Sequence, residues 1–313
     1  MDSKFAVAAI GGNAIILENQ VGTIQEQFVN CEEFLYPIAV LVSKGWKIVL
    51  THGNGPQVGS ALLRVELSRK QVYPLPLDVC VADTQGGMGY MIQNVLGKLL
   101  RKLKSEISVA SVVTQIEVDP FDAAFKKPTK PVGPFYTKEQ IEYYEKEERW
   151  AVGKDEKGRW RRLVPSPKPK RILETQVIKK LAQEDVLVIA CGGGGVPVIR
   201  TQNGYKGVEA VIDKDLASSL LASEIGAEML IITTGEDRVA LHYKKPEQKD
   251  LEHLAIDEAE KYLRDGEFPP GSMGPKIEAA IQFLRKGGKE SLITTPEHLL
   301  EALEGKTGTR ITI

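Results

Sequence analysis

The sequence predicts an α/β fold built around a mainly parallel sheet. Short apolar runs are followed directly by glycines at three places, FAVAAI (5–10), WKIVL (46–50) and VLVIA (186–190). Runs of five or six residues without polar alternation are typical of strands that are buried on both faces. Helical stretches lie between these runs, and the order strand, helix, strand favours right-handed crossovers between parallel strands.

The remaining elements follow from the same patterns. Helices are expected at 25–43, 85–103, 172–183, 215–225 and 275–286. Gly45 and the pair Gly287-Gly288 follow two of these stretches, and glycine is favoured just past a helix end. Pro37 lies inside the first helix, so we expect a kink or an early turn there. Further strands are predicted at 108–116, 228–234, 238–243 and 290–295.

The segment 119–171 interrupts this order. It is charged and contains seven prolines, as well as Trp150 and Trp160. Such an insertion between two sheet strands predicts a protruding subdomain or lid within a single domain spanning 1–313; the alternative is a disordered loop. The ordered form is favoured because ERWAV and GRWRRLV resemble short hairpin strands with charged outer faces.

Composition excludes several classes of partner. The 313 residues suffice for a large buried core. Lys and Arg number 41 against 42 Asp and Glu, which gives a formal net charge of −1. No global positive field therefore attracts nucleic acid or a membrane surface, and we expect neither as a partner. Any binding of anions must come from local groups.

Cysteine and histidine spacing bears on compartment and metals. Cys31, Cys80 and Cys191 lie far apart and form no CxxC pair, which argues against disulfides and structural zinc and favours a reducing compartment. The four histidines never occur at metal-ligand spacing, so no metal ligand is predicted in the chain. The apolar run 5–10 is too short for a signal peptide or a membrane span. We expect a cytoplasmic protein in which Cys191 is a buried bystander.

Glycines follow three of the predicted strands, at 11–12, 53–55 and 192–195. In open α/β sheets, ligands bind in the crevice beyond the carboxyl ends of the strands. Glycine lets backbone N–H groups approach an anion, and the following helix adds its positive end. One such loop would be weak evidence because tight turns need glycine, but three predict a shared phosphate or carboxylate site.

Two nucleotide-binding fingerprints are incomplete. Gly305-Lys306-Thr307 resembles the end of a Walker A loop, but the first glycine of that motif would fall on Leu300. Gly53 and Gly55 begin a G-x-G-x-x-G pattern whose third glycine position holds Val58. The P-loop match therefore fails, and a dinucleotide-binding dehydrogenase is disfavoured without being eliminated.

Three lysines stand in unusual settings. Lys130 lies among three prolines, Lys214 lies between Asp213 and Asp215, and Lys276 opens the helix predicted over 275–286. Phosphoryl transfer needs charge stabilisation on the migrating group more than covalent chemistry. A lysine is usually a solvated surface residue, so each alone is weak evidence, but together the three favour phosphoryl transfer.

Seven segments together resemble the signature segments of carbamate kinases. They are GGNA (11–14), THGNGPQVG (51–59), PTKPVGP (128–134), GGGGVP (192–197), VIDKDLA (211–217), GSMGPK (271–276) and GKTGT (305–309). The resemblance implies the amino-acid-kinase fold, a three-layer α/β/α sandwich around a mainly parallel sheet, usually in a homodimer. Many relatives carry a lysine two residues before the first Gly-Gly, where this chain has Ala9. Carbamate kinases share this absence and take the charge from the protruding segment, where Lys130 lies.

The resemblance also implies residue roles. Lys130 and Lys214 would bracket the transferred phosphoryl group, with Asp215 holding the lysines in place. The carbamate or carbamoyl phosphate end would be held by Gly11, Gly12, Asn13, Gly53, Asn54 and Gly55. The nucleotide would be bound by Lys214, Thr234, Met273 and Lys276. The loop that begins at Thr234 departs from the Asp found in many relatives, which leaves the nucleotide contacts there open.

The implied reaction is direct in-line transfer between ATP and carbamate, running towards ATP from carbamoyl phosphate in a fermentative or arginine-degrading setting. Mg²⁺ would be bound largely through nucleotide oxygens. Carbamate is already anionic, so no general base is required. A kinase with another carboxylate or phosphate acceptor, a non-catalytic nucleotide-binding regulator and a dehydrogenase stay open as alternatives. We expect 119–171 to close over the site, because carbamoyl phosphate is labile in water.

Overall fold

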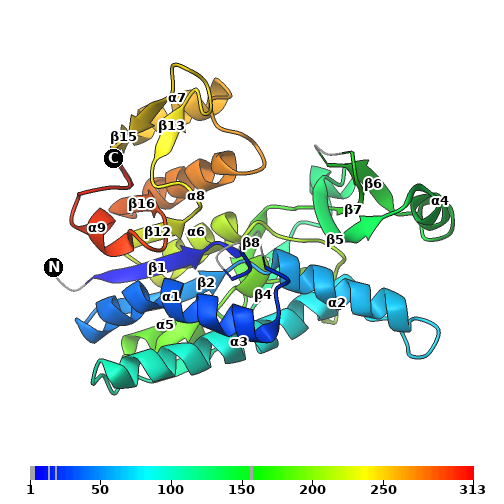
Figure 1. Ribbon diagram of the computed structural model, residues 1–313, viewed down its shortest axis with the longest axis horizontal. Helices are drawn as coiled ribbons and strands as arrows, with labels where there is room; N and C mark the ends of the chain where they lie inside the picture. The colour runs from blue at the N-terminus through cyan, green and yellow to red at the C-terminus, as the bar shows by residue number, and fades with distance from the viewer. Residues whose placement is uncertain (1–3, 13–14, 18–19, 156–157) are drawn as a thin grey trace.

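A computed structural model describes residues 4–12, 15–17, 20–155 and 158–313, and Figure 1 shows their arrangement. An eight-stranded sheet lies between two layers of helices, which confirms the predicted α/β/α sandwich. In spatial order its strands are β15 (His253–Ala255), β17 (Thr309–Thr312), β16 (Glu290–Thr294), β12 (Met229–Thr233), β1 (Phe5–Ile10), β2 (Lys47–His52), β9 (Leu187–Ile189) and β3 (Val109–Ser111). The six strands from β16 to β3 are parallel, and β17 runs antiparallel to β16.

The central strands are apolar throughout because both faces of the sheet are covered. In β1, Ala6 and Ala8 pack into one core, and Val7 and Ala9 into the other; all four are fully buried. Successive side chains of a strand point to opposite faces, so a strand between two helical layers needs apolar residues at every position. This double burial explains why the apolar runs lack alternation.

The helices are α1 (Ile24–Ser43), α2 (Gly55–Ser68), α3 (Leu77–Lys102), α4 (Lys138–Glu147), α5 (Thr175–Gln183), α6 (Lys214–Ile225), α7 (Ile256–Arg264), α8 (Met273–Arg285) and α9 (Leu299–Leu303). Helices α1 and α3 cover one face of the sheet, and α6 and α8 the other (Figure 1). The early turn expected at Pro37 is wrong, since α1 continues through it to Ser43. Ile38 and Leu41 are buried beyond the proline, and this packing offsets the missing hydrogen bond.

The strand predicted over 108–116 is divided between two sheets. Its first part is β3, and its second part is β4 (Gln115–Val118) in a four-stranded sheet with β8 (Pro169–Ile172), β10 (Val196–Thr201) and β11 (Gly204–Gly207). The break lies at Thr114, whose N–H donates to Gln85 Oε1 (2.7 Å) and whose carbonyl accepts from Gln85 Nε2 (3.2 Å). A side chain of α3 thus replaces the sheet partner at this point. The strand predicted over 238–243 is shorter, β13 (Val239–Leu241), and pairs with β14 (Lys249–Leu251).

The strands of the segment 119–171 that belong to the small sheet project from one end of the sandwich (Figure 1). The predicted hairpin is confirmed as β6 (Ala151–Lys154) and β7 (Trp160–Val164), to which β5 (Lys130–Tyr136) adds a third antiparallel strand. Tyr144 of α4 stacks on Trp150 at 4.1 Å and donates to Glu66 of α2 (2.6 Å). Arg69, the C-cap residue of α2, pairs with Glu148 (2.8 Å). Val132 and Val164 are buried with Val58 and Leu62, so apolar and polar contacts together join this small sheet to α2.

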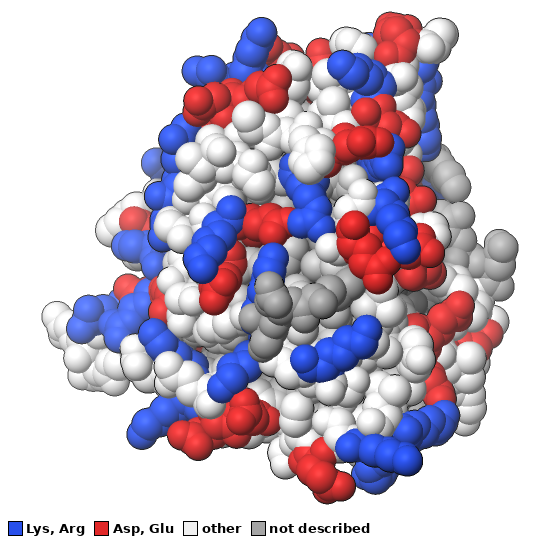
Figure 2. Space-filling view, turned by 90° about the vertical axis from the view of Figure 1, so that its left-hand side faces the viewer, with Lys and Arg blue, Asp and Glu red and all other residues white. Residues whose placement is uncertain are grey.

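No helix among the described residues is both long and apolar enough to cross a bilayer. Figure 2 shows one face of the molecule, on which Lys and Arg lie interspersed with Asp and Glu. No single sign of charge dominates that face, in keeping with the net charge of −1.

Candidate active site

A cavity of about 870 Å³ lies at the carboxyl ends of β1, β2 and β12, below the protruding sheet. The prediction that the three glycine loops converge is confirmed, because Gly11 and Gly12, Gly53 and Gly55, and Gly193 all line it. Parallel strands end at one edge of a sheet, so loops distant in sequence meet there.

Close approach of neighbouring backbone explains why positions 53 and 194 in these loops hold glycine. A Cβ built on Gly53 would lie 2.8 Å from the backbone nitrogen of Gly12, so the first two loops could not pack with larger residues. Gly194 has φ +92, and a Cβ there would collide with the carbonyl of Ile212. The third loop therefore presses against the segment that leads into Lys214.

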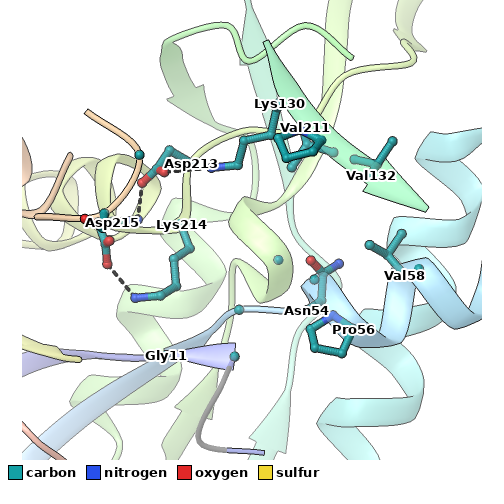
Figure 3. A pocket seen from close by; sticks show the side chains of 18 of the residues that line it. Gly11, Asn54, Pro56, Val58, Lys130, Val132, Val211, Asp213, Lys214 and Asp215 are labelled. Atoms are coloured by element: carbon teal, nitrogen blue, oxygen red, sulfur yellow. Dashed lines mark hydrogen bonds and ion pairs between the residues drawn. The ribbon is translucent and has the colours of Figure 1, made fainter. Parts of the chain in front are cut away.

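The predicted lysines meet two aspartates in this cavity (Figure 3). Lys130 Nζ lies 3.0 Å from Asp213 Oδ2, and Lys214 Nζ lies 2.5 Å from Asp215 Oδ1. Lys276 Nζ, in the first turn of α8, lies 3.1 Å from Asp215 Oδ2. Asp215 thus holds two of the three lysines, while Lys130 is held by Asp213 and not, as expected, by Asp215.

Asp213 has a second task at the start of α6. Its Oδ1 accepts from the backbone N–H groups of Asp215 (2.9 Å) and Leu216 (3.5 Å), which is the hydrogen bonding of an N-cap. One carboxylate therefore begins the helix that carries Lys214 and also pairs with Lys130 from the protruding sheet.

Buried hydroxyls fix the first turn of α6 to the central sheet. Thr51 Oγ1, at the end of β2, lies 2.6 Å from Ser218 Oγ, which donates to the carbonyl of Lys214 (2.6 Å). Thr51 and Ser218 are fully buried. This chain links the loop after β2 to the backbone of Lys214, so the two cannot shift independently.

Burial and charge set the protonation of the central pair. The side chains of Lys214 and Asp215 are only 14% and 4% exposed. Burial lowers the pKa of Lys214, the charge of Lys276 lowers it further, and Asp215 opposes this change only in part. Burial alone would raise the pKa of Asp215, but the two neighbouring ammonium groups outweigh it and the pKa is lowered. Asp215 is therefore an anion that organises two cations.

No catalytic role is predicted for a histidine or a cysteine, and both His52 and Cys191 are buried. Burial and, less strongly, the charge of Lys214 lower the pKa of His52 to about 4, against a hydrogen bond between its Nδ1 and the Gly53 carbonyl. His52 is thus neutral at pH 7. Cys191 is fully buried, and burial raises its pKa, as expected of a bystander thiol.

Some predicted site residues lie elsewhere than expected. Thr234 lines the cavity, but Met273 packs against the hydrophobic core between the sheet and α8 and does not line it. Asn13 lies outside the described residues. Asn54 lines the cavity but is only 4% exposed, and its Nδ2 donates to Thr84 Oγ1 (2.9 Å). Asn54 therefore has one amide N–H committed to α3.

Asp213 and Arg161 line the cavity and are absent from the predicted site residues. Asp213 was considered only as a neighbour of Lys214, although an Asp directly before a predicted helix is an N-cap signal that marks it. Arg161 of β7 also lines the cavity, and the run Arg159 to Arg162 gives no local sign of which side chain faces inward.

The sequence matches one protein family over most of its length. The model of the amino acid kinase family matches residues 4–295. The chain belongs to the amino acid kinase family. Similar curated proteins include the carbamate kinase of Pyrococcus horikoshii, 46% identical over 308 residues and 98% of each chain. Another is the carbamate kinase of Thermococcus kodakarensis, 47% identical over 312 residues, or 98% of this chain and 99% of that one.

Solved structures agree with this membership. The carbamate kinase of Giardia lamblia bound to AMP-PNP superposes with a TM-score of 0.94 at 40% identity, covering 99% of this chain and 98% of that one. Relatives this similar along nearly the whole chain indicate a phosphotransferase. The predicted family and enzyme class are thereby confirmed.

Proposed function

We propose that this enzyme is a carbamate kinase, which transfers a phosphoryl group reversibly between ATP and carbamate. The observation that carries the proposal is the cluster in which Asp213 and Asp215 hold Lys130, Lys214 and Lys276 around one cavity. The relatives named as carbamate kinases share this chain over nearly its whole length, which supports carbamate as the acceptor.

In the direction of ATP synthesis, a β-phosphate oxygen of ADP attacks the phosphorus of carbamoyl phosphate. The bond between phosphorus and the carbamate oxygen breaks, and carbamate leaves with the electron pair. Lys130 and Lys214 lie on either side of the migrating group and stabilise the charge on its oxygens, which is the main demand of phosphoryl transfer. Both the entering and the leaving oxygens are anionic, so no general base is needed, in keeping with the neutral, buried His52.

The glycine loops bind the small substrate. Gly11, Gly12 and Gly53 line the cavity and leave room for a close approach of the substrate to the backbone, although the N–H of Gly53 donates to the Ile10 carbonyl (3.0 Å). Gly55 begins α2, whose N-terminal dipole favours an anion. The burial of Asn54 leaves its backbone and its remaining amide hydrogen as the available donors. Gly11, Gly12, Gly53, Asn54 and Gly55 thus form the carbamoyl phosphate end of the site.

The nucleotide binds at the α8 end of the same cavity. Lys276, Thr234 and Lys214 line this part, and Lys276 is placed in the first turn of α8 to reach phosphate oxygens. Met273 takes part only through packing, since it does not line the cavity. The relative from Giardia lamblia bound to AMP-PNP supports ATP or ADP as the nucleotide.

Mg²⁺ is the cofactor in this proposal and is carried mainly by nucleotide phosphate oxygens. Among the described residues, no three His, Cys, Asp or Glu side chains gather to hold a metal ion. Asp213 and Asp215 are each engaged by lysines, so the residues present fit an ion that arrives with the nucleotide. When bound, the ion neutralises phosphate charge and orients the phosphate chain.

Ala9 bears on the choice of acceptor. It is fully buried in β1 and packs into the core on the α6 side of the sheet, where a lysine would need a charged partner. The protruding strand β5 supplies Lys130 to the cavity instead. This arrangement favours carbamate over the acceptors of kinases that carry a lysine at the first strand.

A homodimer and a cytoplasmic location complete the proposal. Leu67, Val72 and Tyr73, at and just beyond the end of α2, are 76%, 55% and 81% exposed, which suits burial against a second copy of the chain. Light scattering should give twice the mass of the 34.5 kDa chain, and Leu67→Glu should lower it. The three cysteines are unpaired and buried, which fits a reducing compartment.

The decisive assay is ATP formation from ADP, Mg²⁺ and carbamoyl phosphate, with acetyl phosphate as the control donor. Rapid ATP formation from carbamoyl phosphate and little from acetyl phosphate is expected. If neither donor yields ATP, the proposed acceptor is wrong and a panel of other carboxylate and phosphate acceptors must be tested.

A further inference from the structure

Among the described residues, four cationic side chains line the cavity, and three of them have carboxylate partners. Lys130, Lys214 and Lys276 each lie within 3.1 Å of an aspartate oxygen. The fourth, Arg161, makes no ion pair within the part of the chain that the structure describes. A cation beside a cavity without a carboxylate is free to pair with a bound anion.

Backbone contacts hold Arg161 in position. It lies on β7, opposite the irregular part of β5 between Val132 and Tyr136, and its Nη2 donates to the Gly133 carbonyl (2.9 Å). Its guanidinium carbon lies 5.4 Å from the centre of the Phe135 ring. These contacts fix the planar group at one edge and leave its other donors to be satisfied.

One of those donors is buried without an acceptor. Arg161 Nε is shielded from solvent and has no hydrogen-bond partner. Buried polar groups are almost always hydrogen-bonded, so an orphaned guanidinium nitrogen beside a large cavity indicates that a ligand completes its contacts. Asp155 acts on Arg161 electrostatically, and Asp155 forms an ion pair with Arg159 (2.7 Å).

The position of Arg161 selects one end of the cavity. Its hydrogen-bonded neighbour Gly133 packs against α2, since a Cβ on Gly59 would lie 3.7 Å from the Gly133 carbonyl and one on Gly133 would lie 3.8 Å from Leu62. Helix α2 begins at Gly55, in the loop assigned above to the small substrate, whereas the nucleotide end is marked by Lys276 on α8.

We propose that Arg161 is a substrate-binding residue that pairs with an oxyanion of carbamoyl phosphate from the protruding sheet, opposite the glycine loops. This inference rests on the proposed function for the identity of the ligand. Arg161 can present two donors in one plane to a phosphoryl or carboxylate group, which a lysine cannot do. The acyl phosphate is thereby bound between the core loops and the protruding sheet.

The test compares Arg161→Ala and Arg161→Lys with Arg159→Ala, a matched control that removes another arginine beside the Phe135 ring that does not line the cavity. Loss of a charge-assisted hydrogen bond should raise KM for carbamoyl phosphate about 10-fold to 100-fold in Arg161→Ala. KM for ADP should change less than about 2-fold, and Arg159→Ala should behave as wild type. Free guanidinium ion should partly restore Arg161→Ala.

Binding of inorganic phosphate, measured by calorimetry on the same variants, gives a readout that needs no turnover. Weaker phosphate binding together with a raised KM assigns Arg161 to the phosphoryl oxygens; a raised KM with unchanged phosphate binding assigns it to the carbamoyl end. Unchanged KM and unchanged phosphate binding would overturn the inference, as would equal changes in both KM values, which indicate only support of Gly133. If the wild-type enzyme binds phosphate, binding weakens in Arg161→Ala, and no ATP is formed, the proposed reaction is refuted while the anion-binding role of Arg161 stands.

Discussion

Lys214 and Lys130 reach the same cavity from two regions of the molecule that are built differently. Lys214 comes from the core: it begins α6, its side chain is 14% exposed, and its partner Asp215 is 4% exposed. Lys130 comes from the protruding sheet, its side chain is 38% exposed, and its partner Asp213 is 16% exposed. The core lysine is locked by buried contacts, whereas the other lysine is held by one pair that water can reach.

The supports of the two regions differ in the same way. The core sheet is covered on both faces by large apolar clusters. The protruding sheet joins α2 through a smaller apolar cluster, in which Val132 and Val164 are buried with Val58 and Leu62. Two polar pairs, Tyr144 with Glu66 and Arg69 with Glu148, add to it. Partly exposed polar contacts are exchanged for water at little cost, and a small apolar cluster stabilises less than the two large ones, so we expect this region to be the less rigid of the two. Within the proposed function, this comparison predicts a division of labour in which the core preorganises one charge and the protruding sheet supplies the other.

The largest expected effect comes from the core lysine. Lys214→Ala should lower kcat about 1000-fold, the upper range for removing one preorganised group that stabilises transition-state charge. Lys206→Ala, an exposed lysine of β11 away from the cavity, is the control and should keep wild-type kcat. A Lys214→Ala enzyme within a few-fold of wild type would show that the core charge is dispensable.

Acid should weaken the core through His52. Its pKa is near its usual 6.5 in the unfolded chain but about 4 in the folded protein, so only the unfolded chain takes up a proton between these values. Stability is therefore complete above pH 6.5 and falls as the pH drops towards 4, by up to roughly 3 kcal/mol. Urea unfolding from pH 7 to 4.5 should show a shallower loss in His52→Gln than in wild type; parallel curves would contradict this account.

A smaller effect is expected where the two regions meet. Asp213→Asn keeps an oxygen that can cap α6 but removes the charge that attracts Lys130. We expect kcat to fall about 10-fold while the free energy of unfolding changes by less than about 1 kcal/mol. A strongly destabilised Asp213→Asn protein would mean that the charge serves the helix rather than Lys130.

The smallest effect should come from the contact between α4 and α2. Tyr144→Phe removes the hydrogen bond to Glu66 and keeps the stacking on Trp150. We expect kcat to change less than about 3-fold. Hydrogen exchange in 130–164 should become faster in the variant without substrates and slower when ADP and carbamoyl phosphate are added. Equal exchange with and without substrates would count against closure of the segment 119–171.

The features that sequence could predict are local. The strand runs followed by glycines, the helix predicted over 215–225, and the hairpin around Trp160 all depend on neighbouring residues, and the structure has them. The features it missed depend on distant partners. Gln85 divides the strand at Thr114 from 29 residues away, and the pair of Lys130 with Asp213 spans 83 residues.

The inward position of Arg161 has a similar cause. The register of β7 against β5 and an irregularity near Gly133 decide which arginine of the run faces the cavity. No spacing within the run itself carries that information, since alternation alone leaves two registers open. The role predicted for Met273 rests on its motif position alone, and its partly buried side chain packs against the core.

The most direct test of the division of labour is a single-turnover measurement of phosphoryl transfer by Lys130→Ala with saturating ADP and carbamoyl phosphate. The account predicts that the chemical step slows about 100-fold while the Kd for ADP is unchanged, because Lys130 acts on the migrating group and not on the nucleotide. A chemical step as fast as that of wild type would contradict the account, because Lys214 and Lys276 would then stabilise the migrating group without help from Lys130.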